Sequence, residues 1–161
     1  MGAQKVDGYS SRIYKTFTPA LRQSLTHFTL SGGNVMVSGA YIGSDMMAAD
    51  EQKFTADIFK YQLTGVQPND SITFVSGMNT ELTVYGRMNE VRYPVPRMDV
   101  ISPVGGAFPT MAYRPAGVSA AVAYQGADYH SLAFGFPLES ITDVEVRRSI
   151  FYAATQFLLN R

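Results

Sequence analysis

Three side chains of this 161-residue chain are of the types that cleave ester, amide or glycosidic bonds. Ser38 follows a short apolar run and precedes Gly39, where a strand would turn sharply. His130 stands at the start of a later apolar segment, and Glu139 stands just after its end. A serine hydroxyl becomes nucleophilic only when a neighbouring base accepts its proton. A hydrolase would therefore need His130 or Glu139 within hydrogen-bond reach of Ser38.

Each of these residues also has an ordinary structural interpretation. A small residue such as Ser38 is needed wherever a strand turns tightly, and Val-Ser-Gly matches only part of the Gly-x-Ser-x-Gly nucleophile pattern. A histidine in a turn, as expected for His130, is most often simply exposed. Glu139 either faces a cleft or begins the loop before the last helix. The structural interpretation of Ser38 is favoured over catalysis.

The residues after Ser38 are candidates for binding a ligand. Open α/β sheets bind ligands outside the carboxyl ends of their strands, which places a cleft near Ser38 to Asp45. Gly39, Tyr41, Ser44 and Asp45 would line it, and an aromatic ring with adjacent polar groups suits a sugar. Ser and Asp also favour helix starts, so Ser44 and Asp45 are alternatively expected to cap the next helix.

Composition excludes several classes of function. The chain has no cysteine, so it forms no disulfide, thiolate nucleophile or cysteine zinc site. Its two histidines lie far apart, and we expect neither a metal site nor a cofactor. Thirteen basic and thirteen acidic residues balance, which gives no electrostatic reason to bind nucleic acid. No apolar run approaches the roughly 20 residues of a membrane span.

Strand and helix patterns at both ends of the chain predict one α/β domain with helices on both faces of a sheet. Thr18-Pro19 is an N-cap followed by proline at the first helical position, and Thr142 to Glu145 has capping-box spacing. Residues 61–117 alternate in short stretches and predict small strands and long loops, some antiparallel. The other expected elements are strands over 35–37, 118–124 and 131–136, and helices over 51–60 and 142–158.

Two segments carry a family resemblance. Leu25 to Met46, with its core from Gly32 to Met46, and Ala133 to Glu139 before a capped helix, resemble segments of secreted bacterial xanthan lyase-like proteins. That domain is similar to the class I glutamine amidotransferase-like fold, a flavodoxin-like three-layer sandwich. The resemblance implies a largely parallel sheet with a strand- and loop-rich insertion. It also implies that residues 1–161 form a single domain of a larger extracellular or periplasmic protein.

The motifs depart from the amidotransferase pattern at both expected catalytic positions. Ser38 falls at or beside the position of that family's nucleophilic cysteine, and Phe136 replaces the histidine of its His-Pro-Glu motif. Phenylalanine cannot accept a proton, so no glutaminase activity is expected. The resemblance therefore implies a non-catalytic accessory domain whose partners are neighbouring domains of the parent protein, with polysaccharide as a candidate ligand. The alternatives are a serine hydrolase, and a structural module with an exposed apolar patch.

Overall fold

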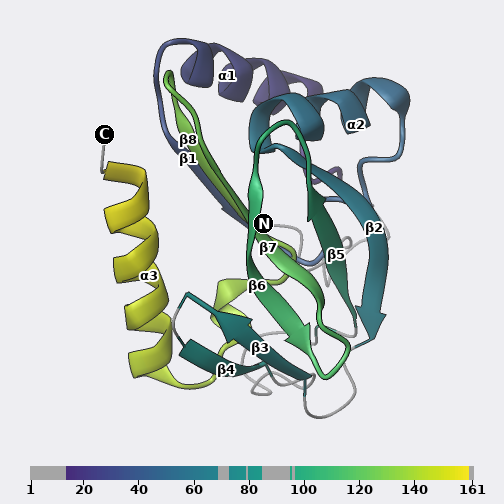
Figure 1. The fold of residues 1–161 in the computed structure, drawn as a ribbon. Coiled ribbons are helices and arrows are strands. Elements are labelled where there is room, and N and C mark those ends of the chain that lie inside the picture. Colours follow the sequence, from purple (N-terminus) through teal and green to yellow (C-terminus); the bar gives the residue numbers. More distant parts are fainter. Residues whose placement is uncertain (1–13, 69–72, 79, 85–94, 96, 160–161) are drawn as a thin grey trace.

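The computed structural model describes residues 14–68, 73–78, 80–84, 95 and 97–159, and it has a mixed α/β fold (Figure 1). Strands dominate the middle of the chain, while helices occur near both ends of the described part. The elements are α1 (Pro19–Leu30), β1 (Val35–Ser38), α2 (Ala49–Phe54), the π-helix η1 (Thr55–Phe59), β2 (Tyr61–Pro68), β3 (Thr73–Gly77), β4 (Thr80–Val84), β5 (Arg97–Pro103), β6 (Phe108–Arg114), β7 (Val118–Gln125), β8 (His130–Phe134), the 3₁₀-helix η2 (Leu138–Ser140) and α3 (Val144–Leu159).

The helix predicted after Thr18-Pro19 is confirmed as α1. The Thr18 side chain accepts a hydrogen bond from Leu21 N at 3.3 Å, which satisfies one of the free N–H groups at the helix start. Leu21 and Leu25 pack inward on the same helix face. The helix ends before Gly32, whose φ of 82° is a conformation that glycine adopts without strain.

The prediction of a largely parallel sheet is wrong. The main sheet has the strand order β1-β8-β7-β6-β3-β4, and within it only β1 and β8 run parallel. Parallel neighbours need a crossover of about a dozen residues or more. Only residues 126–129 join β7 to β8, and only residues 115–117 join β6 to β7. Connections this short make hairpins, so these strand pairs are antiparallel.

Residues 61–117 contribute half of the main sheet and are therefore more than an insertion. β6, β3 and β4 extend the sheet beyond β7, as the expectation of antiparallel strands allowed. β2 and β5 form a separate two-stranded antiparallel sheet with a bulge between Leu63 and Gly65. β5 is joined to the end of β8 by the hydrogen bond from Asp99 N to Gly135 O at 2.8 Å.

Helices cover both faces of the main sheet. Along β8, Leu132 and Phe134 point to one face and Ala133 points to the other, as the two-residue period of a strand requires. The face of Leu132 packs against α3 through Ile150 and Ala154. The opposite face packs against α1, α2 and η1 in a second core that contains Val35, Val37, Phe54, Ile58 and Phe59.

The last helix begins at Val144, two residues after its predicted start at Thr142. Asp143 Oδ1 accepts hydrogen bonds from Glu145 N at 2.8 Å and Val146 N at 3.1 Å, so Asp143 and not Thr142 caps α3. The predicted inward face is confirmed, with Ile150 and Ala154 buried and Val146, Phe157 and Leu158 half-buried. None of the helices in the described part of the chain is both long and apolar enough to cross a membrane.

Candidate functional site

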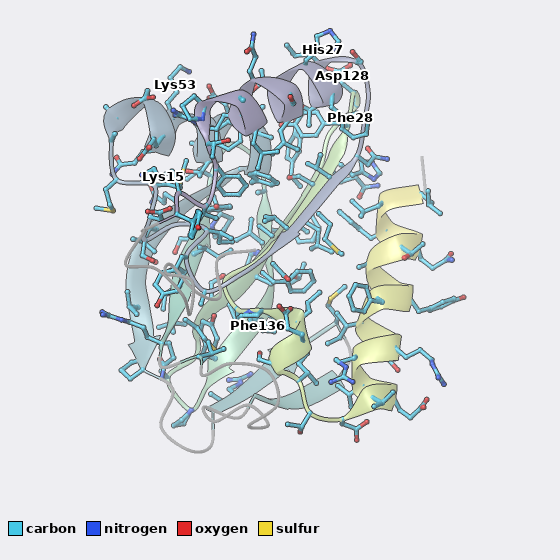
Figure 2. The ribbon with its side chains drawn as sticks, turned by 180° about the vertical axis from the view of Figure 1, so that it is seen from behind. Lys15, His27, Phe28, Lys53, Asp128 and Phe136 are labelled. Carbon is cyan, nitrogen blue, oxygen red and sulfur yellow. The ribbon has the colours of Figure 1, made fainter. Side chains whose placement is uncertain are left out.

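Ser38 and His130 lie at opposite ends of the parallel pair formed by β1 and β8. Ser38 is paired with Phe134 at the end of β8, whereas His130 is the first residue of that strand. His130 and Phe134 are four residue steps apart, which at about 3.3 Å per residue corresponds to about 13 Å along the strand. In Figure 2, Asp128, two residues before His130, lies beside the end of α1. Phe136, two residues after the strand partner of Ser38, lies far along the molecule. The structure does not bring this pair together.

Glu139 belongs to a segment that does contact Ser38. The backbone nitrogen of Leu138 lies 3.4 Å from Ser38 Oγ, and Glu139 is the next residue in η2. Both Ser38 and Glu139 are half-buried. Of the three residues predicted for hydrolysis, Ser38 and Glu139 therefore share one neighbourhood and His130 lies elsewhere.

His130 holds α3 against the start of β8. Its side chain is buried, and its Nδ1 lies 2.9 Å from the carbonyl oxygen of Phe157, whose ring packs on the imidazole at a centroid distance of 5.3 Å. The backbone N–H of His130 donates to Asn34 Oδ1 at 2.7 Å, and Asn34 Nδ2 donates to Leu158 O. The expectation that His130 is exposed is wrong, because α3 covers this end of the strand.

The loop of residues 39–46, here called the 39–46 loop, holds the predicted ligand-binding residues. Gly39 N donates to Phe134 O at 3.2 Å and so continues the ladder between β1 and β8. Tyr41 is half-buried and packs against the core on the α3 side. Tyr61, which begins β2, is buried and donates from its hydroxyl to Ile42 O at 2.8 Å. The start of the loop and its centre are therefore tied to neighbouring strands.

Asp45 is occupied by the segment that precedes α1. Its Oδ2 accepts a hydrogen bond from Thr16 N at 2.6 Å, and Lys15 Nζ lies 3.7 Å from its Oδ1. The same lysine pairs with the buried Glu51 at 2.9 Å. Glu51 in turn accepts from Ala48 N, at 3.2 Å, just before α2. The expectation that Asp45 caps the next helix is therefore wrong, because Ala48 is the N-cap residue of α2 and the Asp45 carboxylate accepts from Thr16 N instead.

A buried carboxylate that the sequence interpretation missed organises the middle of the loop. Asp99 on β5 is fully buried, and its Oδ2 accepts hydrogen bonds from Gly43 N at 2.7 Å and Ser44 N at 3.0 Å. Tyr113 donates from its hydroxyl to the Asp99 carbonyl oxygen at 3.0 Å. The other carboxylate oxygen, Oδ1, has no hydrogen-bond partner among the described residues.

Burial controls the electrostatics of this region. Removal from water raises the pKa of Asp99, against the opposing effect of the hydrogen bonds from Ser44 and Gly43. Burial also raises the pKa of Tyr61 and Tyr113 well above the usual value, and the Asp99 charge adds to both shifts. The region therefore favours neutral forms of these groups.

One signal in the sequence could have identified Asp99. The residue stands within the otherwise apolar run from Met98 to Ile101, and carboxylates are almost never fully buried unless they have hydrogen-bond partners. A single acid in a buried strand therefore indicates a structural or functional polar contact. The carbonyl oxygen of Asp99 also explains Gly135, since a Cβ at that position would lie only 2.0 Å from it.

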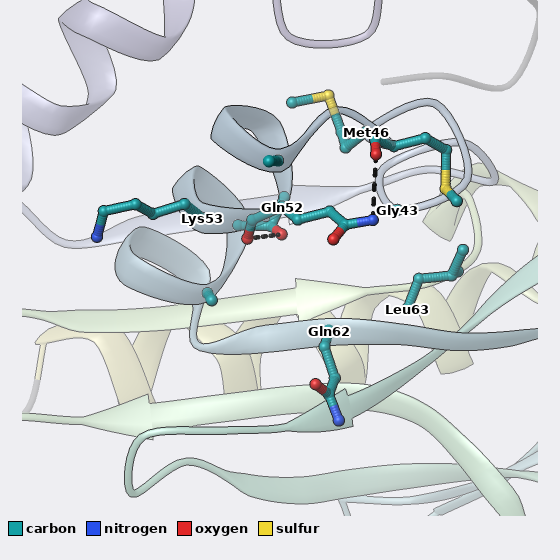
Figure 3. A pocket seen from close by; sticks show the side chains of 10 residues that line it. Gly43, Met46, Gln52, Lys53, Gln62 and Leu63 are labelled. Atoms are coloured by element: carbon teal, nitrogen blue, oxygen red, sulfur yellow. Dashed lines mark hydrogen bonds between the residues drawn. The ribbon is translucent and has the colours of Figure 1, made fainter.

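A pocket of about 410 Å³ lies at the far end of the 39–46 loop, between α2, η1 and β2 (Figure 3). Gly43, Met46 and Leu63 line it, but Ser38, Tyr41, Ser44 and Asp45 do not. Gln52 is held in place by a hydrogen bond from its Nε2 to Met47 O at 3.2 Å, and the Lys53 side chain extends away from the other labelled residues. The pocket is therefore small, mixed in polarity and separate from the residues predicted for catalysis.

A second pocket, of about 250 Å³, lies at the start of β8, far from Ser38. Asn34, Gln125, Asp128, Tyr129 and His130 are among its lining residues. Tyr129 donates from its hydroxyl to Asp57 O at 2.8 Å, and burial raises its pKa to about 12. Among the residues that the structure describes, no group of three His, Asp or Glu side chains could hold a metal ion.

Comparison with known proteins detects the fold but no sequence relationship. No protein-family model matches the chain, and no curated protein matches it in sequence. The N-terminal domain of mmIFT52 matches 90% of this chain and 73% of its own chain, with a TM-score of 0.59 and 13% identity. The cytoplasmic protein STM3548 from Salmonella typhimurium matches 96% of this chain and 65% of its own, with a TM-score of 0.59 and 12% identity.

Similar domains also occur within larger enzymes. Gan42B, a GH42 beta-galactosidase from G. stearothermophilus, matches 86% of this chain with a TM-score of 0.59 and 15% identity. The match covers 19% of the beta-galactosidase chain. This chain therefore spans about a fifth of that enzyme. At these identities the comparisons establish a shared fold and nothing further about activity.

Proposed function

We propose that this chain is a non-catalytic α/β domain of a larger secreted protein concerned with polysaccharide, in which it contacts neighbouring domains or a ligand. The separation of Ser38 from His130 along β8 carries the proposal, because it removes the one imidazole predicted to activate the serine. The placement in a larger protein agrees with the domain's likeness to about a fifth of a beta-galactosidase chain.

The polar groups after Ser38 support a structural use of this region. Asp99 binds the backbone of Gly43 and Ser44, and Asp45 binds the backbone of Thr16. A catalytic group must be free to meet a substrate, whereas these carboxylate oxygens already accept hydrogen bonds from the fold. We also propose the finer fold assignment, a flavodoxin-like relative of class I glutamine amidotransferases. The helices on both faces of the sheet support it, whereas the antiparallel strands from β8 to β4 depart from the parallel sheet of that fold.

A serine hydrolase is the second candidate, because Glu139 lies next to the residue that contacts Ser38 Oγ. The test is labelling by a fluorophosphonate and hydrolysis of p-nitrophenyl acetate, measured for the wild type, Ser38→Ala and Glu139→Gln. The proposal predicts that the variants equal the wild type in both assays. Labelling or turnover that depends on Ser38 would reject it and favour the hydrolase.

The ligand part of the proposal has a separate test. Titration of polysaccharide fragments into the isotopically labelled protein would shift backbone resonances near the 39–46 loop if the ligand binds at the carboxyl ends of β1 and β8. Shifts confined to another surface would overturn that placement, and an absence of shifts would leave neighbouring domains as the partners.

A further inference from the structure

The exposed face of α3 carries apolar side chains in a symmetric pattern. Its exposed large apolar residues are Val144, Phe151, Tyr152 and Leu159. Val144 is the first of the sixteen helical residues and Leu159 is the last, while Phe151 and Tyr152 are the two in the middle. These side chains, with Arg148 and Thr155, form a stripe about 100° wide at 3.6 residues per turn.

The stripe faces away from the rest of the domain. α3 contacts the sheet through Ile150 and Ala154, which lie on the opposite side of the helix. Figure 1 shows α3 standing alone along one side of the molecule, with no other labelled helix beside it. Tyr152 is 68% exposed and Leu159 is 71% exposed, so these side chains offer apolar surface that folding of the chain leaves in contact with water.

We propose that the α3 stripe binds the α3 stripe of a second copy of this chain, with the two helices antiparallel about a two-fold axis between Phe151 and Tyr152. A two-fold interface requires that residue i contacts residue j while j contacts i. In this register Arg148 and the partner's Thr155 face each other along the middle of the stripe, and Val144 meets the partner's Leu159. Phe151 lies beside the partner's Phe151 along one edge, and Tyr152 lies beside the partner's Tyr152 along the other edge. Each exposed apolar residue thus meets another apolar residue.

The charges of α3 favour the antiparallel direction. Glu145, Arg147 and Arg148 all lie in its first five residues, and residues 149–159 carry no charge. Antiparallel packing keeps the charged ends of the two copies apart. It also places each Arg148, whose Nη1 pairs with Glu145 of its own helix at 2.9 Å, in the direction of the C-terminal end of the partner helix, where the free carbonyl groups carry partial negative charge. A parallel pair would instead place like charges opposite each other.

The size of the surface sets the expected strength of the dimer. A 16-residue helix is about 24 Å long and about 10 Å wide, so one face covers about 240 Å². This area is smaller than the roughly 800 Å² that each partner buries in a standard interface. We expect a weak dimer whose population rises as protein concentration increases. Sedimentation equilibrium of the 161-residue chain from about 10 µM to about 1 mM should detect it. A single monomeric species over the whole range would overturn the proposal.

Charged substitutions in the stripe test where the copies meet. Phe151→Glu and Tyr152→Glu should each raise the dissociation constant at least about tenfold, because each buries a carboxylate against an aromatic ring. Phe28→Glu is the matched control, since Phe28 is 51% exposed on α1 and Phe151 is 46% exposed. Circular dichroism verifies that each variant is folded. Equal weakening by the α1 and α3 substitutions would reject the α3 interface.

Disulfide trapping tests the register, and the cysteine-free sequence makes the result clean. A mixture of Arg148→Cys and Thr155→Cys chains should form a mixed disulfide on mild oxidation. Neither variant alone should form a disulfide dimer as readily, because identical residues of the two copies would lie about 10 Å apart along the helices, beyond disulfide reach. Preferential crosslinking of identical residues would exclude the antiparallel register and overturn the proposal.

Discussion

Oδ2 of Asp99 lies 2.7 Å from the backbone nitrogen of Gly43, so a carboxylate on β5 holds the loop that follows β1. The same oxygen accepts from Ser44 N at 3.0 Å. The loop and β5 are far apart in sequence, and β1, which the loop follows, lies in a different sheet from β5. The shape of the 39–46 loop therefore depends on where β5 places this side chain.

Replacing Asp99 should show how much the hydrogen bonds of its side chain stabilise the fold. Asp99→Ala leaves the N–H groups of Gly43 and Ser44 without their acceptor and should reduce the free energy of unfolding by about 2–4 kcal/mol. Asp99→Asn keeps a carbonyl oxygen that can accept both hydrogen bonds and should cost less. Urea unfolding followed by circular dichroism measures both values. An equal loss in the two variants would show that the hydrogen bonds contribute little.

The raised pKa of Asp99 also predicts a dependence of stability on pH. The folded state holds the proton of Asp99 more tightly than the unfolded chain, in which the pKa of this carboxyl group is near 3.8. The stabilising contribution of the neutral acid is therefore full below pH 3.8, and it is lost as pH rises toward the folded pKa. Unfolding free energies of the wild type and Asp99→Asn, compared from about pH 3.5 to pH 7, should show the variant gaining relative to the wild type as pH rises. The opposite trend would contradict the shift.

Gly135 should tolerate no side chain, because its neighbour is backbone. A Cβ there would lie 2.0 Å from Asp99 O and 3.2 Å from the Tyr113 hydroxyl. Gly135→Ala should reduce the free energy of unfolding by about 3 kcal/mol, at the upper end of overpacking costs. Gly65→Ala is the matched control, since the nearest atom to its Cβ is 3.8 Å away. Comparable losses in both variants would mean that general loss of glycine, and not the close approach of β5, is responsible.

Asn34 should matter for the attachment of α3. Its side chain accepts from His130 N and donates to Leu158 O, so Asn34→Ala removes two hydrogen bonds in a half-buried place. We expect a loss of about 1–3 kcal/mol in thermal or urea unfolding. Ser31→Ala, which removes an exposed hydrogen bond to His27 O, should change stability by less than about 0.5 kcal/mol. A loss no larger than that of the control would show that Asn34 does not anchor the helix.

Local signals predicted most of the individual elements correctly. Thr18-Pro19 marked the start of α1, and the apolar run at Val35 marked β1. The direction of the strands was predicted wrongly, although the relevant information was present. The short connection from Gln125 to His130 has no room for a crossover, and its length alone indicates an antiparallel pair.

The candidate site was less predictable than the fold. Whether Ser38 and His130 meet depends on the direction and register of β1 and β8, which no local pattern encodes. Asp99 was missed because its partners are backbone groups of a loop more than fifty residues earlier. Contacts of this kind arise from tertiary packing, and hydrophobic periodicity carries no record of them.

The parallel pairing of β1 with β8 also has a consequence for the order of folding. Val35 is paired with Ser131, so the whole central part of the chain must be arranged before β1 can join the sheet. The hairpins of β6, β7 and β8 close through short turns and cost far less loop entropy. We therefore expect the three-strand meander to form first and β1 to dock late, so that the segment containing Ser38 acquires its structure only near the end of folding.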